Sequence, residues 1–322
     1  MEDVFEIQDD ISQAIVKALR VILSEDEKKQ IEKVRAVNVE AYDYYLRGMQ
    51  HFHQFRRKSL EQARQMFNKA IECDPTYARP YAGVANCYSL LYSYFDAREL
   101  NLRQADVASR KALELEPSLA ESHVSRGLAV SLSKRFDEAE QEFEEAMRLD
   151  PTLFDAPYWY AQAQLSQGKY EDTVRLGERA IFLRPEDYQS LGFTGIALKS
   201  LGRHSEALAW YRKQVRLIEA HLELHPDDAR ACIMGASANA NIGDEERSAY
   251  YAARAMAVDP EDPMVLYNVA CAYGILGKVP ECLDALEQAV SKGWGDKAWM
   301  EHDSDLEAIH EEPRFLALMQ AM

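Results

Sequence analysis

The chain has 322 residues, of which 47% are hydrophobic, and 37 basic against 54 acidic side chains give it a formal net charge of −17. Phosphate binding needs a basic surface, so this acid excess argues against direct nucleic-acid binding. The length would allow two globular domains, but a chain of repeats would instead extend one continuous core.

The opening segment predicts an amphipathic helix over residues 3–23, because its apolar residues recur at helical spacing. We expect residues 1–40 either to cap the first repeat or to link it to a domain outside this chain. The helix begins directly after Met1, which favours a piece of a longer protein. Its apolar residues are Val4, Ile7, Ile11, Ile15, Ala18 and Ile22.

The features that report on location favour a cytoplasmic protein. The first residues are acidic where a signal peptide needs positive charge, and no apolar run reaches the length of a membrane span. The cysteines are odd in number and lack paired spacing, which indicates free thiols in a reducing compartment. They are Cys73, Cys87, Cys232, Cys271 and Cys282.

A turn-and-helix signature returns along most of the chain. Its later copies begin at Lys134, Gly168, Gly202, Gly243 and Gly277. Three of the four steps are 34 residues long, and the step from Gly202 to Gly243 is 41. Two helices of about a dozen residues and two short connections fill such a unit. Each unit therefore predicts one helical hairpin.

Glycines and prolines mark the ends of the predicted helices. Glycine adopts the left-handed backbone conformation without strain, so we expect the signature glycines to end first helices. Proline cannot continue a helix and marks the boundary between units. The boundary prolines are Pro75, Pro117, Pro151, Pro185, Pro226 and Pro260.

A recurring order of large, small and aromatic residues carries a family resemblance. In a first helix it reads Leu266, Val269, Ala270 and Tyr273, and in a second helix Ala139, Phe143, Ala146 and Pro151. These residues resemble the tetratricopeptide repeat (TPR) family over about seven units, from residue 42 to residue 293. The resemblance implies an all-α, right-handed α-solenoid, with residues 294–322 as a C-terminal capping segment.

Three interruptions distinguish this chain from regular repeats. The first unit carries about three extra residues around 55–58, and the second about eight within 90–101, where three aromatic residues either pack on a neighbouring helix or contact a partner. In the fifth unit the second helix runs on to Pro226 and absorbs seven residues. Seven residues are nearly two turns, so the inward face should keep its direction.

A narrower resemblance lies at the ends of the chain. The stretches 3–11, 44–48 and 266–273 and the tail around 299–315 are similar to the C-terminal repeat region of bacterial multidomain signalling proteins. In such proteins similar regions follow nucleotide cyclase, kinase or winged-helix DNA-binding domains. None of those domains is recognisable in this chain, so the resemblance implies no activity for the residues present.

Few residues suggest catalysis or metal binding. His221 and His225 are four apart, the spacing of helical metal sites, but no third ligand is visible and they fit exposed histidines near a helix end. Asp303 and Asp305 lie beside His302, lack the other oxygen ligands of a calcium loop and should cap the following helix. Without a nucleophile motif or a phosphate-binding loop, we expect no enzyme, cofactor or metal site.

The TPR resemblance implies that first helices line a concave groove. This groove should take an apolar helix or an extended peptide, with aromatic residues as anchors. The positions of the family's carboxylate clamp lack the required lysine, arginine and asparagine set. The candidate partner-binding residues are Tyr45, Asn86, Val124, Tyr158, Gln162, Phe193, Lys199, Arg230, Met234, Asn241, Tyr267 and Asn268.

Two functions remain open from the sequence. One is a non-catalytic scaffold that binds a protein or peptide in its groove, with no nucleic acid and no membrane as partner. The other is a regulatory or oligomerising module of a larger signalling enzyme or transcription regulator, and as an oligomerising module the chain would form a homo-oligomer. Residues 259–322 carry a net charge of −9, which either serves solubility or attracts a basic partner.

Overall fold

Helices account for all regular secondary structure in residues 38–294 and 297–322, the part of the chain that the computed structural model describes. The amphipathic helix predicted over residues 3–23 lies outside these ranges. Within them, seven helical hairpins follow one another in the order expected for the repeats. None of the described helices combines the length and apolarity needed to cross a bilayer.

The hairpins pair each odd-numbered helix with the even-numbered helix that follows it. They are α3 (Val39–Phe52) with α4 (Arg57–Cys73), α5 (Ala78–Tyr94) with α6 (Glu99–Leu115), α7 (Ala120–Leu132) with α8 (Phe136–Leu149), α9 (Asp155–Ser166) with α10 (Tyr170–Leu183), α11 (Tyr188–Ser200) with α12 (His204–Leu224), α13 (Ala229–Ile242) with α14 (Glu245–Val258), and α15 (Pro263–Ile275) with α16 (Val279–Ser291). The C-terminal segment adds α17 (Lys297–His302), the 3₁₀ helix η1 (Ser304–Ile309) and α18 (Pro313–Ala321).

The turns inside the hairpins confirm the role predicted for the signature glycines. Gly168, Gly202, Gly243 and Gly277 have φ angles of 72°, 73°, 80° and 67°, in the left-handed region that glycine adopts without strain. Lys134 occupies the equivalent position of an earlier turn with φ 58°. This conformation costs a residue with a side chain free energy, so this turn is strained, as is the turn of the first hairpin, where Phe55 has φ 50°.

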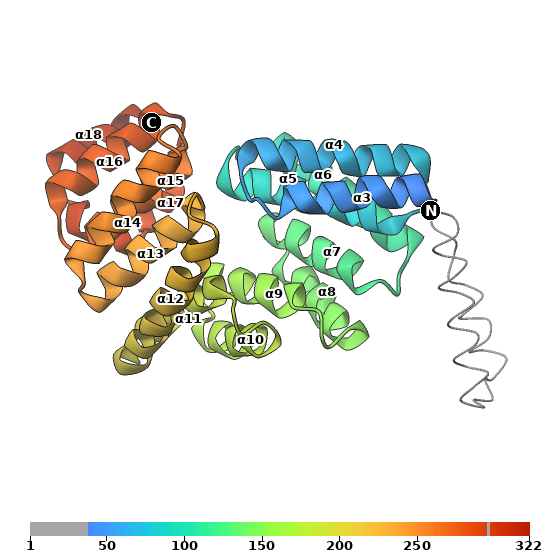
Figure 1. The fold of residues 1–322 in the computed structure, drawn as a ribbon, viewed down its shortest axis with the longest axis horizontal. Helices are drawn as coiled ribbons and strands as arrows, with labels where there is room; N and C mark the ends of the chain where they lie inside the picture. Colours follow the sequence, from blue (N-terminus) through green and yellow to red (C-terminus); the bar gives the residue numbers. More distant parts are fainter. Residues whose placement is uncertain (1–37, 295–296) are drawn as a thin grey trace.

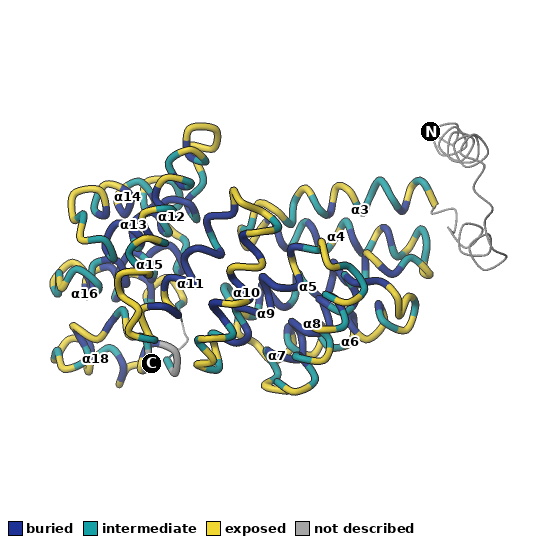
Figure 2. Tube along the Cα trace, turned by 90° about the horizontal axis from the view of Figure 1, so that it is seen from below, coloured by how far each residue is buried: buried dark blue, intermediate teal, exposed yellow. Residues whose placement is uncertain are grey.

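Close packing of helices within the hairpins depends on small residues opposite large ones. The ring of Phe67 is fully buried between α3 and α5. A Cβ atom added at Gly48 or Gly83 would lie 2.4 Å or 2.7 Å from that ring, closer than real contacts allow. Gly127 makes the same room for Phe143 in a later unit. Buried residues accordingly follow the lines where neighbouring helices face each other (Figure 2).

The extra residues of the fifth unit lengthen α12, as predicted. This helix has 21 residues, and its added turns still bury Ile218 and Leu222 in the same core as α13 and α15. The insertion of nearly two turns thus preserves the inward face. It also carries His221 to the inner surface of the solenoid.

The C-terminal segment closes the end of the core. Gly274 of α15 lets η1 approach, because a Cβ atom there would lie 2.1 Å from the carbonyl oxygen of Asp305. The carboxylate of Asp303 accepts a hydrogen bond from the Asp305 backbone N–H at 3.0 Å, which confirms the capping role predicted for Asp303, whereas Asp305 lies inside η1. Tyr267 donates its hydroxyl proton to Asp303 at 2.6 Å and stacks on Trp294, with ring centroids 4.2 Å apart.

Replacing Asp305 by asparagine is expected to stabilise the protein above neutral pH. Burial raises the pKa of the Asp305 carboxyl to about 7, with a further rise from Asp303 and an opposing effect of Lys199. A carboxyl with a higher pKa in the folded chain than in the unfolded chain costs stability as pH rises between the two values, by up to about 1.4 kcal/mol per pH unit. Thermal unfolding should show equal melting temperatures near about pH 4 and a higher one for the variant at about pH 8.

Glu307, an exposed acid on the same 3₁₀ helix, provides the control. Glu307→Gln should leave the dependence of melting temperature on pH unchanged. If Asp305→Asn also melted in parallel with the wild type across this range, the Asp305 carboxyl would not be the group that loses its proton at a cost to the fold.

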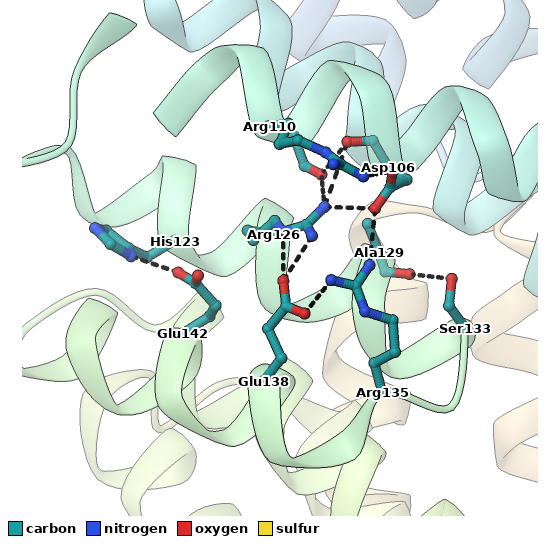
Figure 3. Close-up of polar contacts among 10 residues, drawn as sticks. Asp106, Arg110, His123, Arg126, Ala129, Ser133, Arg135, Glu138 and Glu142 are labelled. Atoms are coloured by element: carbon teal, nitrogen blue, oxygen red, sulfur yellow. Dashed lines mark hydrogen bonds and ion pairs between the residues drawn. The ribbon is translucent and has the colours of Figure 1, made fainter. Parts of the chain in front are cut away.

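A buried ion-pair network joins α6, α7 and α8 (Figure 3). Arg126 is 4% exposed, and its guanidinium contacts Asp106 Oδ1 at 2.7 Å and Glu138 Oε1 at 2.6 Å. Arg135 reaches the same two carboxylates from the turn before α8. Because both charges that Arg126 neutralises belong to other helices, the network ties the second hairpin to the third.

The solenoid curves until its early and late units meet. Figure 1 shows the chain passing from α3–α6 through α7–α10 and returning through α11–α18. Arg56 Nη2, before α4, donates a hydrogen bond to the Asp227 carbonyl oxygen at 2.9 Å, across 171 residues of sequence. Cζ of Arg230 lies 3.5 Å from the ring centroid of Phe55. We refer to these two interactions as the closing contact.

Candidate functional site

The curvature encloses a cavity of about 290 Å³ on the inner side of the solenoid. The first helices α3, α5, α7, α9, α11 and α13 all contribute to its lining, together with the turn before α4 and the end of α12. The closing contact forms one of its edges, since Phe55 and Arg230 both line it. The cavity is therefore a product of six units and belongs to no single hairpin.

Aromatic side chains build one wall of the cavity. Tyr158 lies between Phe154, at a centroid distance of 5.2 Å, and Phe193, at 5.5 Å. Its hydroxyl donates to Gln189 Oε1 at 3.1 Å, which fixes the ring. Trp159 meets the same ring edge-on at 4.8 Å. Such a wall offers rigid apolar contact area, because these rings have no freedom left to lose when a ligand binds.

Three arginines line the cavity, of which one forms an ion pair and two stack on aromatic rings. Arg79 pairs with Glu121 at 3.2 Å. Arg184 and Arg230 instead lie on aromatic rings, with Cζ of Arg184 3.8 Å from the centroid of Phe154. Stacking of this kind holds the guanidinium plane while leaving its N–H groups directed outward along the edge.

The cavity carboxylates are constrained by their surroundings. Burial raises the pKa of the Asp155 carboxyl above its ordinary value, and the nearby charges of Arg184 and His53 reduce that rise. Asp155 is accessible to solvent, yet the concave wall around it withholds much of the water that would stabilise its charge. Asp228 contacts His221 Nε2 at 2.8 Å and caps α13 by accepting from a backbone N–H.

Two buried polar atoms of the lining have no hydrogen-bond partner among the described residues. They are Oδ1 of Asn86, an acceptor on α5, and Nη1 of Arg230, a donor on α13. A buried polar group without a partner costs about 1–3 kcal/mol. A ligand that supplied one donor and one acceptor would recover this free energy.

The structure brings five of the twelve residues proposed from the sequence to the cavity: Tyr45, Asn86, Val124, Tyr158 and Arg230. Val124 is 2% exposed and contributes to the floor. These five come from five of the six first helices that line the cavity, α3, α5, α7, α9 and α13, and α11 contributes other residues.

Three further candidates near the cavity hold other side chains in place. Phe193 packs behind Tyr158, and Met234 lies against Gly192 of α11. Gln162 accepts a hydrogen bond from the Tyr94 hydroxyl at 3.2 Å.

The remaining candidates lie towards the C-terminal units. Lys199 Nζ donates to Asn241 Oδ1 at 3.2 Å, which joins α11 to α13. Tyr267 lies under the C-terminal segment, 3% exposed. Asn268 Nδ2 donates to the Met264 carbonyl oxygen one turn earlier at 2.8 Å. None of these four lines the cavity.

Several lining residues were not proposed from the sequence because they lie outside the first helices or at their edges. Arg184 follows α10, Asp155 opens α9, and Phe55 belongs to an insertion. His221, predicted to be exposed at a helix end, is partly buried beside Asp228 in the lining. The insertions in the first and second units were the sequence signal for this part of the lining. Their residues Phe55 and Tyr94 lie against each other, with ring centroids 5.2 Å apart.

Opening the closing contact should enlarge the molecule. The double variant Phe55→Ala, Arg56→Ala removes a cation–π contact worth about 0.5–2 kcal/mol and a hydrogen bond worth about 1 kcal/mol. We expect a larger radius of gyration in small-angle X-ray scattering, with unchanged helical circular dichroism. Arg57→Ala, next in sequence but paired only with Glu61, is the control and should leave the radius as in the wild type. An unchanged radius in the double variant would show that the curvature needs no closing contact.

The cysteines form no disulfide in the structure, and four of the five are buried. Sγ of Cys271 lies with the carboxylates of Asp303 and Asp305 in a cluster whose nearest atoms are within 4.8 Å of one another. Cys271 donates weakly to Asp303, which also binds Tyr267. These contacts stabilise the packing of η1 against α15.

Four features of the chain agree with one fold. They are the 34-residue period, the hairpins in series, the left-handed glycines in the turns and the concave face built from first helices. The chain has the tetratricopeptide-repeat fold. A structure of an IFIT1 monomeric mutant with Gppp-AAAA is similar to it, with a TM-score of 0.57 and 17% identity, over 73% of this chain and 55% of that one. This likeness supports the fold.

Comparison by sequence places bacterial regulators among the relatives of the TPR chain. A profile of the bacterial transcriptional activator domain matches residues 96–230. A Rhizobium meliloti (strain 1021) protein that carries the name adenylate cyclase 3 is 34% identical over 142 residues, 44% of this chain and 24% of that protein. The transcriptional regulator HilA of Salmonella typhimurium (strain LT2) is 24% identical over 159 residues, 49% of this chain and 28% of HilA. The matches span about a quarter of each relative.

Proposed function

We propose that this TPR chain is a cytoplasmic interaction module that binds an extended peptide segment of a partner protein in the cavity. The observation that carries the proposal is the pair of buried atoms without partners, Asn86 Oδ1 and Arg230 Nη1, in one aromatic-walled cavity. Every peptide bond offers an N–H donor and a C=O acceptor, so a peptide backbone matches this pair.

The dimensions of the cavity favour a short segment over a folded partner. Its volume of about 290 Å³ lies at the lower end of ligand pockets in proteins. A few residues of extended chain fit such a space, whereas a globular surface cannot enter it. Tyr158 and its aromatic neighbours would then contact an apolar side chain of the segment, since aromatic residues dominate binding energy at such positions.

The proposal can be tested by selecting peptides from a random display library with the wild-type protein. Binding of the selected peptides should weaken at least about tenfold in Asn86→Trp, which fills the cavity, and in Tyr158→Ala, which removes its wall. Phe182→Ala, a change at a 74% exposed ring outside the cavity, should bind as the wild type does. Selected peptides that bind all four proteins equally would place the binding site elsewhere.

A second candidate function is a regulatory module of a larger signalling protein. The similarity to named regulators supports it, because it covers one part of each and matches the activator-domain profile. In this case the reading frame upstream of Met1 should encode a cyclase, kinase or DNA-binding domain. An in-frame stop codon directly upstream would remove this candidate. Light scattering of the purified chain would test whether it also oligomerises.

A further inference from the structure

Two guanidinium groups in the cavity form no ion pair with any described residue. Arg184 and Arg230 both line the cavity, and among the described residues neither has a carboxylate oxygen within 4 Å. Eight of the 21 arginines in the described part lack such a contact, and Arg184 and Arg230 are the two of them that line the cavity. Thirteen other arginines in the described part do contact a carboxylate, namely Arg47, Arg57, Arg79, Arg98, Arg103, Arg110, Arg126, Arg135, Arg148, Arg175, Arg203, Arg247 and Arg314.

Both arginines are positioned before any ligand arrives. Arg184 lies over Phe154 and Arg230 over Phe55, at 3.8 Å and 3.5 Å from Cζ to the ring centroid. A stacked guanidinium has lost much of its rotational freedom, so less entropy is lost when its N–H groups bind an anion. Nη1 of Arg230 is buried and has no acceptor among the described residues.

The carboxylates that line the cavity form no ion pair with Arg184 or Arg230 in the described structure. Glu121 pairs with Arg79, and Asp228 is occupied by His221 and the cap of α13. Asp155 influences Arg184 only from beyond ion-pair distance in the described structure. The anionic partner that a guanidinium normally has is therefore missing from the cavity itself.

We propose that Arg184 and Arg230 bind an anionic side chain of the peptide, a carboxylate or a phosphate monoester, through the N–H edges of their guanidinium groups. The inference rests on the proposed peptide-binding function and adds the chemical class that the cavity selects. Guanidinium groups bind both anions in a bidentate manner, with stronger hydrogen bonds than neutral donors form.

The charge of the whole chain limits the ligand to one or two negative charges at this position. A polyanion such as a nucleic acid would meet a net charge of −17 and the carboxylates of Asp155 and Glu121 in the same cavity. Repulsion from them would oppose binding of any phosphate beyond those that the two arginines hold. A single acidic or phosphorylated residue in an otherwise neutral segment avoids this cost.

The test uses three synthetic peptides with blocked ends and the sequence Ala-Leu-X-Leu-Ala, in which X is glutamate, phosphoserine or glutamine. Binding is followed by NMR through the Nε–Hε signals of the arginine side chains and by titration calorimetry. The glutamate and phosphoserine peptides should bind at least about tenfold more tightly than the glutamine peptide, because each forms charge-assisted hydrogen bonds. The difference between glutamate and phosphoserine identifies the preferred anion.

Arginine variants locate the effect. Arg184→Gln and Arg230→Gln should each reduce the preference for the anionic peptides at least about tenfold. Arg212 and Arg216, which also lack ion pairs but lie exposed on α12 outside the cavity, are the controls, and their glutamine variants should keep the preference. Phe55→Ala removes the ring under Arg230 while retaining the charge, so it should reduce the preference for the anionic peptides less than Arg230→Gln does.

The outcomes distinguish this inference from the function on which it rests. If all three peptides bind the cavity with equal affinity, the anion site is excluded and the peptide-binding function remains. If a preference for the anion persists in both cavity arginine variants, the anion binds elsewhere and the inference is wrong. If no peptide from this series or from the display library binds the wild type, the proposed function and the inference both fail.

Discussion

Replacing Arg126 by methionine should lower the free energy of unfolding by about 1.5–3 kcal/mol, the contribution of hydrogen bonds to charged groups. The guanidinium is 4% exposed and neutralises Asp106 and Glu138, which come from the helices on either side of α7. Without it, Asp106 and Glu138 keep their ion pairs with Arg135, but the buried hydrogen bonds that α7 contributes to the network are lost. Urea unfolding followed by circular dichroism measures the loss.

Two further variants show whether the loss belongs to the buried network. Arg148→Ala breaks an exposed pair with Glu145 and should cost much less stability, because water screens such a pair. Combining Arg126→Met with Asp106→Leu and Glu138→Leu removes all three charges, and it should recover most of the stability lost in the single variant. A single variant as stable as the wild type would mean that water enters the network and screens its charges.

Replacing Phe67 by alanine is the other change with a large expected effect, a loss of about 3–5 kcal/mol. The ring is fully buried against Gly48 and Gly83. These glycines have no side chains that could fill the space left by the ring. Apart from the closing contact, each unit of this repeat protein packs mainly on its neighbours, so the damage should centre on α3, α4 and α5. Hydrogen exchange read by mass spectrometry should therefore show faster exchange in these helices than in α13–α16.

Phe182 serves as the matched control because it has the same side chain at 74% exposure. Phe182→Ala should change the free energy of unfolding by less than about 0.5 kcal/mol. Equal losses in the two variants, or faster exchange spread evenly over all hairpins after Phe67→Ala, would show that the solenoid unfolds as one unit and that local packing does not decide its stability.

The fold was predictable because its signals are local. A glycine such as Gly243, with φ 80°, ends its helix for reasons contained in a few residues, and the 34-residue period repeats those reasons along the chain. The extension of α12 was equally accessible, since the seven added residues preserve the apolar face that reaches Ile218. The capping role of Asp303 follows the same rule of short range.

The candidate site was only partly predictable. Tyr158 and Asn86 could be identified because they occupy inward positions of first helices. Arg184 could not, because it follows a second helix and reaches the cavity only through the curvature of the solenoid. Tyr267 occupies an equivalent inward position but is covered by the C-terminal segment through its bond to Asp303. The position of a residue within its repeat does not show whether a later segment of the chain covers it.

By itself, the sequence determined that this protein is a series of helical hairpins with three interruptions, because helix ends, periodicity and close packing depend on neighbours a few residues apart. Only the tertiary structure decided that the arc closes. A small rotation at each unit accumulates along the solenoid, and no single spacing reports the sum. The accumulated rotation brings Phe55 of the first unit to Arg230 of the sixth unit. This contact forms one edge of the cavity.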